Sequence, residues 1–320
     1  MRASSTLHLI GSTLGLLSNT QPSLSQAQDA EARKGLKHAF IAVVMFSLTV
    51  PFTEMALASF SPASIAFSRG GIAGVVSLMF VMYMTAMGAW RLPVGREWLW
   101  LALGGICVCF VFPYTLSAAM QSWQAADMGV ALAGIPLLTG IVASVLFAER
   151  HSRGFWISVM VGTLALMVFS VIKAQTVDAP WQALVAVLSA AVGYSFGGRV
   201  AKSFGGFQTI CWMCLLYLPI SSLGMGYSIG QDARLNDGVW SSNALYGLLY
   251  LAIVSQWLGF HFWYGAMAKI GVAKVGPVQL LQPFFTLLFA VALLGERLYG
   301  YQVLFAGVIA LAVFSAMKSK

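Results

Sequence analysis

The chain has 320 residues, of which 59% are apolar and only 9% are charged. Soluble domains carry about 25% charged residues, so this chain has too few charges to form a water-facing surface. The net charge of +8 does not indicate a nucleic-acid partner, because the basic residues stand singly or in pairs between apolar stretches, as they do in membrane proteins. The composition therefore predicts an all-α membrane protein with many transmembrane helices.

Residues 1–34 are predicted to form a disordered cytoplasmic tail. The segment LHLIGSTLGLL at 7–17, with Arg2 before it and SQA at 25–27 after it, resembles a signal peptide. Cleavage would leave the basic residues at 33–37 outside the cell, against the rule that positive charge stays inside. A tail is therefore the preferred interpretation.

Apolar stretches of about 20 residues, the length that crosses a bilayer as a helix, alternate with charged breaks along the rest of the chain. The period-two alternation of a membrane β-barrel is absent. The sequence predicts ten transmembrane helices, at 36–58, 63–88, 98–118, 125–147, 154–173, 182–200, 208–229, 243–265, 274–294 and 300–317.

Ten spans place both termini on the same side of the membrane. If that side is the cytoplasm, 14 basic residues lie in its loops and tails and 3 lie in the opposite loops. This asymmetry predicts a bacterial-type inner membrane protein with both termini cytoplasmic. The larger group is Arg2, Arg33, Lys34, Lys37, Arg91, Arg96, Arg150, Arg153, Arg199, Lys202, Lys269, Lys274, Lys318 and Lys320, and the smaller is Lys173, Arg234 and Arg297.

The two halves of the chain match each other when one is shifted by 147 residues. The predicted repeats are 35–174 and 181–320, and each holds five spans. Because five is odd, the second repeat enters the membrane in the opposite orientation. Inverted repeats are the architecture of alternating-access carriers, which bind substrate near the midplane. The shift pairs polar as well as apolar positions, among them Pro136 with Pro283 and Glu149-Arg150 with Glu296-Arg297.

The segment from 265 to 314 has a turn of small residues, a proline in the following helix, a Glu-Arg pair at that helix's end and a glycine-rich last helix. Residues 118–168 repeat the pattern, and SPASIAFSRG at 61–70 adds an arginine after a small-residue and proline start. These features resemble the EamA repeat of the drug/metabolite transporter superfamily over nearly the whole chain beyond residue 35. The resemblance implies a ten-helix, two-repeat fold that moves small metabolites, but it does not name the cargo.

Ionisable groups inside predicted spans are costly in lipid and are therefore candidates for function. Glu54 and Arg69 form one candidate pair, either as a structural ion pair or with Glu54 coupling transport to protons. Glu149 and Glu296 each end a helix beside an arginine and are expected to cap or pair at that turn. Asp127 begins the fourth span, where a carboxylate complements the positive end of the helix.

Aromatic and polar side chains recur on single faces of several predicted helices. Such stripes are common in helix packing, but their depth and their symmetry between the repeats also fit a substrate cavity. His261 becomes a candidate pH-sensitive group only if it lines that cavity. The predicted substrate-binding residues are Ser47, Thr49, Phe110, Tyr114, Tyr194, Gln256, Trp257, His261, Tyr264, Gln279 and Gln282, and the predicted helix kinks are at Pro51, Pro136 and Pro283.

Rings, hydroxyls and amides with almost no net charge suit an amino acid with an aromatic or large neutral side chain. The chain also resembles the YddG-type aromatic amino-acid exporters of this superfamily, with which the aromatic stripes agree. The alternative is an exporter of cationic drugs or other metabolites.

An intramembrane enzyme or a receptor is disfavoured, because the four histidines are scattered and no H-E-x-x-H or G-x-S-x-G motif occurs. The two cysteine pairs, Cys107 with Cys109 and Cys211 with Cys214, are interpreted as small buried side chains rather than a metal or redox site. The expected partners are a small-molecule substrate and the lipid bilayer. No cofactor, metal or catalytic residue is expected, and no oligomeric state is predicted.

Overall fold

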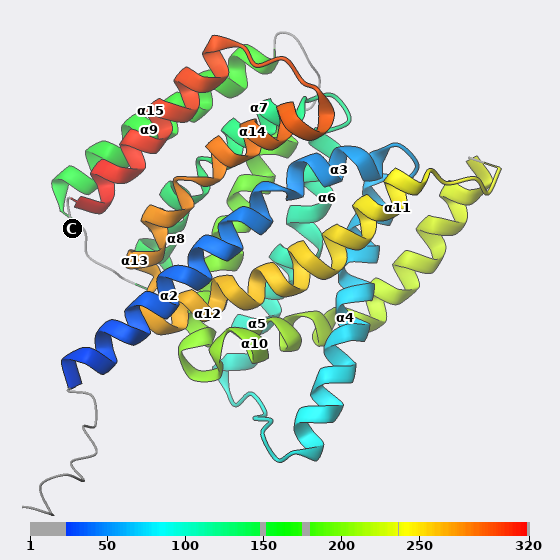
Figure 1. Cartoon of the computed structure of the whole chain (residues 1–320), viewed down its shortest axis with the longest axis horizontal. Coiled ribbons are helices and arrows are strands. Elements are labelled where there is room, and N and C mark those ends of the chain that lie inside the picture. The colour runs from blue at the N-terminus through cyan, green and yellow to red at the C-terminus, as the bar shows by residue number, and fades with distance from the viewer. Residues whose placement is uncertain (1–23, 148–151, 175–179, 236, 319–320) are drawn as a thin grey trace, which may run out of the picture.

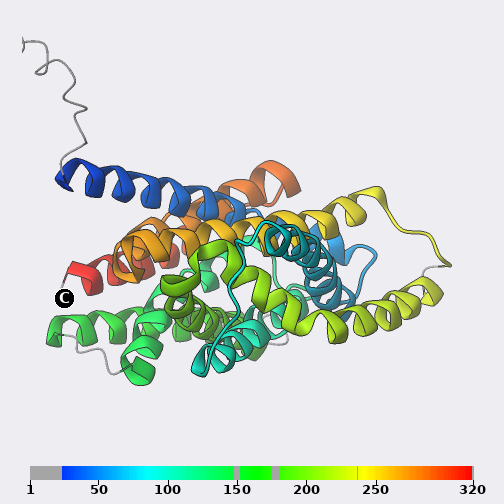
Figure 2. The same ribbon diagram turned by 90° about the horizontal axis from the view of Figure 1, so that it is seen from below.

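The structure, a computed structural model, describes residues 24–147, 152–174, 180–235 and 237–318. These residues form helices and loops and no strand. The start of the first described helix and the end of the last one lie toward the same end of the molecule (Figures 1 and 2). Helices satisfy their backbone hydrogen bonds internally, which suits a chain this apolar.

Helices in the first half of the chain follow the predicted spans, but several spans contain a break or a wider turn. Their bounds are α2 (Leu24–Ser47), α3 (Thr49–Leu57), α4 (Pro62–Ala86), α5 (Arg96–Ile106), the π-helix η2 (Cys107–Val111), α6 (Phe112–Ala119), α7 (Ala125–Leu132), α8 (Ile135–Phe147) and α9 (Arg153–Ala174).

The second half has the same character. Predicted spans 182–200 and 208–229 correspond to two helices, together labelled α10, that meet at a kink at Gly205. The φ of 72° and ψ of 170° at Gly205 are not helical, and a positive φ is readily adopted only by glycine. The bounds are α10 (Pro180–Leu235), α11 (Ser242–Leu249), the π-helix η3 (Tyr250–Gly259), α12 (Phe260–Ile270), α13 (Val272–Gln279), α14 (Gln282–Leu294) and α15 (Gly300–Lys318).

The two helices of α10 are the centre of the packing. It contacts α4, α5 and α12, while α2 lies along α12 and α9 pairs with α15 at one side of the molecule (Figure 1). The interior holds large rings such as Trp123 and Trp263. Large apolar side chains also point outward, with Leu223 77% exposed and Leu311 69% exposed. An apolar exterior around an apolar core is what lipid as a solvent favours.

Six helical stretches in the described part of the chain are long and apolar enough to cross a membrane, judged by length and composition. Three shorter apolar helices, Arg153–Phe169, Gln282–Leu294 and Gly300–Ala312, accompany them. The count of ten membrane crossings therefore stays a prediction. The six stretches are Gln28–Leu57, Pro62–Ala86, Arg96–Ala119, Ala125–Leu146, Trp181–Leu235 and Ser242–Ile270.

Candidate functional site

Breaks in the helices supply much of the site. One break separates α2 from α3 at Leu48, a second separates α7 from α8, and a third separates α13 from α14. Proline fits the first turn of a helix, where its missing N–H is not needed. Each predicted kink residue stands there: Pro51 is the third residue of α3, Pro136 the second of α8 and Pro283 the second of α14.

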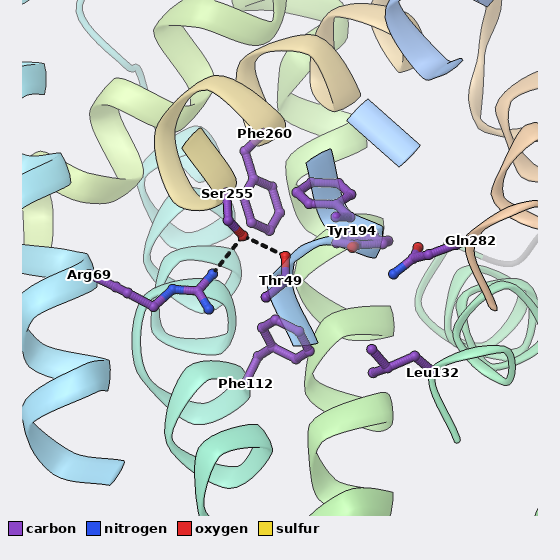
Figure 3. A pocket seen from close by; sticks show the side chains of 9 residues that line it. Thr49, Arg69, Phe112, Leu132, Tyr194, Ser255, Phe260 and Gln282 are labelled. Atoms are coloured by element: carbon purple, nitrogen blue, oxygen red, sulfur yellow. Dashed lines mark hydrogen bonds between the residues drawn. The ribbon is translucent and has the colours of Figure 1, made fainter. Parts of the chain in front are cut away.

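Next to these breaks lies a small pocket (Figure 3). Both halves of the chain contribute to it. One residue at the edge of each break lines the pocket: Thr49, Leu132 and Gln282. The enclosed cavity has room for little more than one water molecule, far less than the ~300–1,000 Å³ of typical ligand pockets, so a whole metabolite requires lining side chains to move. The full lining is Phe46, Thr49, Arg69, Phe112, Leu132, Tyr194, Ser255, Phe260 and Gln282.

Arg69 brings a cation into this pocket from α4. Its side chain is fully buried, and its Nη2 donates to Ser255 Oγ at 3.3 Å and to Gln256 Oε1 at 3.1 Å. Ser255 Oγ is also 2.8 Å from Thr49 Oγ1 (Figure 3). The guanidinium carbon lies 5.9 Å from the centroid of the Phe112 ring, within the range of a cation–π contact. A chain of polar groups thus joins α4, η3 and α3 across the pocket.

A second set of hydrogen bonds ties α2 to α14. The carbonyl of Ser47 has no helical donor, because the residue four positions later is Pro51. The hydroxyl of Thr286 donates to this carbonyl at 3.2 Å. Ser47 Oγ lies 2.7 Å from the carbonyl of Val43 in its own helix and 3.2 Å from the backbone carbonyl of Gln282. Thr286 therefore satisfies the carbonyl that Pro51 leaves free, and the contacts of Ser47 hold α2 against the start of α14 beside the pocket.

The structure brings part of the predicted site together. Thr49, Tyr194 and Gln282 line the pocket. Ser47 and Gln256 do not line it, but each makes a hydrogen bond to a residue that does. Gln279 is also buried, and it lies outside the lining.

The predicted aromatic stripes lie elsewhere. Phe110 packs against Tyr217 with ring centroids 5.3 Å apart, and Tyr114 is 48% exposed. Trp257 packs on the ring of Phe80 at 4.9 Å. The prediction that these three residues line one cavity assumed that their helices have 3.6 residues per turn throughout, as a regular α-helix does.

The other two members of the eighth-span stripe are also outside the lining. Tyr264 is fully buried and donates to the carbonyl of Gly193 at 3.1 Å. His261 packs near Phe207, with ring centroids 5.5 Å apart, and does not line this pocket, so its pH-sensitive role stays a prediction.

The π-helices explain this displacement. A π-turn takes an extra residue per turn and so rotates every later side chain around the helix axis. The segments η2 and η3 occupy the third and eighth predicted spans, and α6 and α12 begin directly after them. The first residue of each, Phe112 and Phe260, lines the pocket instead of the predicted rings.

Sequence reasoning missed five lining residues. Phe112 and Phe260 were missed because the π-turns before them change the face of the helix on which they lie. Phe46 and Leu132 were missed because nothing in the sequence distinguishes them from many other apolar residues. Ser255 carried a usable signal, because it is a hydroxyl beside Gln256 in an otherwise apolar stretch. The five are Phe46, Phe112, Leu132, Ser255 and Phe260.

The predicted pairing of Glu54 with Arg69 is not seen among the described residues. Arg69 extends toward η3 and is held there by Ser255 and Gln256. Glu54, on α3, has a buried Oε2 that makes no hydrogen bond within the described part of the chain. No ion pair therefore joins the two side chains in this structure.

Two other carboxylates act at helix ends. Glu296 accepts the backbone N–H groups of Ala125 at 2.8 Å and Ala126 at 2.9 Å, and so caps the start of α7. Asp127 accepts from Gln302 Nε2 at 2.8 Å. Both fit structural roles, while Glu149 lies outside the described residues.

Within the described ranges, no group of three or more His, Cys, Asp or Glu side chains could hold a metal ion. The four cysteines are free thiols, three of them buried. The polar groups of the pocket are hydroxyls, an amide and a guanidinium, which bind a small molecule rather than supply a nucleophile with a base.

Apolar helices around a polar pocket at helix breaks define a membrane protein of the carrier type. The model of the EamA-like transporter family matches the chain twice, at residues 33–171 and 179–317. The protein belongs to this family and is a transporter rather than an enzyme. The two matches fit the two-repeat organisation that the sequence predicts.

Two similar proteins accompany the family match. The chain is 29% identical over 265 residues to the uncharacterised transporter YdeK of Bacillus subtilis (strain 168), covering 82% of this chain and 90% of that protein. The chain also matches a protein of known crystal structure, with a TM-score of 0.59 and 17% sequence identity. The match covers 88% of this chain and 96% of that protein's chain. At that identity the likeness concerns the fold alone.

Proposed function

We propose that this transporter exports amino acids with aromatic or large neutral side chains from the cytoplasm by alternating access. The observation that carries the proposal is the composition of the pocket. Four rings, those of Phe46, Phe112, Tyr194 and Phe260, provide an apolar wall. The polar partners are hydroxyls, the Gln282 amide and one guanidinium. A polar ligand group that is buried without such a hydrogen-bond partner costs free energy.

The pocket disfavours cationic drugs, the alternative cargo. Its lining holds one cation and no carboxylate, so a positively charged ligand would meet repulsion without a counter-charge. Phosphate-bearing metabolites are also disfavoured, because they call for several converging basic side chains and the lining offers Arg69 alone.

Corresponding features in the two halves support alternating access by two inverted five-helix repeats. The shift of 147 residues carries η2 onto 254–258, within η3. It also carries the break between α7 and α8 onto the break between α13 and α14. Gln256 Nε2 lies 3.6 Å from the Sγ of Cys109, its own counterpart under that shift. A twofold axis that passes through the site would bring such corresponding residues of the two repeats into contact.

Counterflow in proteoliposomes tests the proposal independently of the driving force. Vesicles that contain the purified full chain and unlabelled phenylalanine are given labelled phenylalanine, tyrosine, tryptophan, leucine or methionine. We expect saturable accumulation that the other large neutral amino acids compete with and that a lipophilic cation does not. Competition by the cation alone would favour the drug-export alternative, and no accumulation of any amino acid would reject the proposal.

A further inference from the structure

Arg69 has unused hydrogen-bonding capacity inside the pocket. A guanidinium carries five N–H donors, and both donors of Nη2 are taken by Ser255 and Gln256. The donors on Nε and Nη1 are buried and find no acceptor among the described residues. The side chain is fully buried and lines the pocket (Figure 3).

The surroundings of this guanidinium do not supply its counter-charge. It contacts the Ser255 hydroxyl, the Gln256 amide oxygen and the face of Phe112. The ionisable groups close enough to interact with it are the phenol of Tyr194 and the thiols of Cys109 and Cys214, and none of these is a carboxylate. No salt bridge to Arg69 occurs among the described residues. A buried cation is stable only when it is paired or well hydrogen-bonded. A guanidinium with two buried groups of free donors is therefore suited to bind an anionic group that enters the pocket.

We infer that Arg69 binds the carboxylate of the transported amino acid, so that a free α-carboxylate is a requirement for transport. This inference rests on the proposed function and specifies how that site recognises its substrate. A planar guanidinium matches the oxygens of a carboxylate and forms short, charge-assisted hydrogen bonds with it. The rings of Phe112 and Phe260 then border the space left for the side chain of the amino acid.

The hydroxyl pair has a defined part in this arrangement. Ser255 Oγ accepts from Arg69 and lies 2.8 Å from Thr49 Oγ1, which fixes the guanidinium from one side. Gln256, which is fully buried on η3, fixes it from a second direction. Arg69 is thus pre-oriented before the substrate arrives, which lowers the entropy cost of binding.

Competition for labelled phenylalanine in proteoliposomes tests the inference with four ligands of one shape: phenylalanine, phenylalaninamide, phenethylamine and 3-phenylpropionate. For the unmodified chain we expect the amide and the amine to compete ~10-fold or more weakly than phenylalanine, because both lack the carboxylate. We expect 3-phenylpropionate to compete better than the amine.

Three variants sharpen the test. Arg69→Gln should lose ~10-fold or more in apparent affinity for phenylalanine, and its preference for phenylalanine over phenylalaninamide should fall toward one. Arg69→Lys keeps the charge but not the planar fork and should fall between the two. Arg199→Gln is the matched control, because Arg199 is exposed and rests over the Trp100 ring, away from the pocket. It should keep the preference of the unmodified chain.

Each result is decisive. Equal competition by phenylalanine and phenylalaninamide in the unmodified chain would overturn the role of Arg69 while leaving amino-acid transport intact. An unchanged preference in folded Arg69→Gln would do the same. If the variant does not fold, the ligand series on the unmodified chain decides. If the unmodified chain carries no amino acid at all, the proposed function fails and this inference falls with it.

Discussion

Two residues on α6 show how the surroundings of a side chain decide its role. Phe112 is 7% exposed and lines the pocket beside Arg69, whereas Tyr114 is 48% exposed. The sequence favours Tyr114, because its spacing from Phe110 places both on one face of an ideal α-helix. The π-turn between Cys107 and Val111 rotates the residues that follow it around the helix axis, and Phe112 rather than Tyr114 lines the pocket.

The contrast gives a direct prediction for ligand binding. Phe112→Leu keeps most of the apolar volume but removes a ring from the pocket wall. A ring pair is worth ~0.5–1.5 kcal/mol beyond its burial, so the apparent Kd for an aromatic amino acid should rise a few-fold. Tyr114→Leu, the matched control, should leave it unchanged. Competition assays in proteoliposomes measure both, and the reverse order would show that the path runs along the Tyr114 face.

The interior charges illustrate what the sequence can and cannot predict at this scale. Arg69 is identifiable because a charge within a span is costly and calls for a function. Its partners are not identifiable, because Ser255 and Gln256 lie almost 190 residues further along the chain. The sequence pairs Arg69 with Glu54, the carboxylate of the neighbouring span, whereas packing places it against η3.

At the scale of elements, apolar length and proline position predict most of the helices. The predicted spans follow the observed helices, and the interruptions near Pro51, Pro136 and Pro283 come with them. The predicted spans 182–200 and 208–229 are likewise two helices, separated by the kink at Gly205. What escapes prediction is the number of residues per turn in η2 and η3. It depends on how neighbouring helices pack, and a single sequence has no local signal for it.

Helix α10 crosses α12 at a position where only glycine fits. A Cβ on Gly206 would meet the backbone of Gly265 and the carbonyl of His261, which cannot move aside as a flexible side chain can. Gly206→Ala should therefore push α10 and α12 apart and cost ~1–3 kcal/mol. Its midpoint of thermal unfolding in detergent should fall, and transport should fall with it.

Gly226 provides the control on the same helix. A Cβ there meets no atom within 4 Å, and alanine is a better helix former than glycine. Gly226→Ala should therefore be neutral or slightly stabilising. Equal destabilisation by both alanine variants would refute the close approach of α10 and α12.

The cap on α7 joins the two halves of the chain. Glu296, which follows α14, accepts two backbone N–H groups from the first turn of α7. Loss of such a cap costs ~0.5–2 kcal/mol. Glu296→Ala should lower the unfolding midpoint, and Glu296→Gln should lower it less because one acceptor oxygen remains. Glu31→Ala, which removes exposed ion pairs to Lys34 and Lys269, should have little effect.

For the whole molecule, the remaining question is its orientation in the membrane. The charge asymmetry of the sequence predicts both termini in the cytoplasm. The turn between α10 and α11 lies at the far end of the molecule from the C-terminal end of α15 in both views (Figures 1 and 2). These two ends should therefore be accessible from opposite sides of the membrane.

Cysteine labelling in intact cells tests this orientation. Val239 is 73% exposed in the turn between α10 and α11, and Lys318 is exposed at the end of α15. A membrane-impermeant maleimide should label Val239→Cys directly but Lys318→Cys only after the cells are permeabilised. Three of the four natural cysteines are buried, and Cys107 is partly so, so the unmodified chain measures the background. Labelling of both variants from outside would contradict the predicted topology. The reverse labelling pattern would place the basic loops outside the cell, and the orientation of the proposed exporter in the membrane would then be inverted.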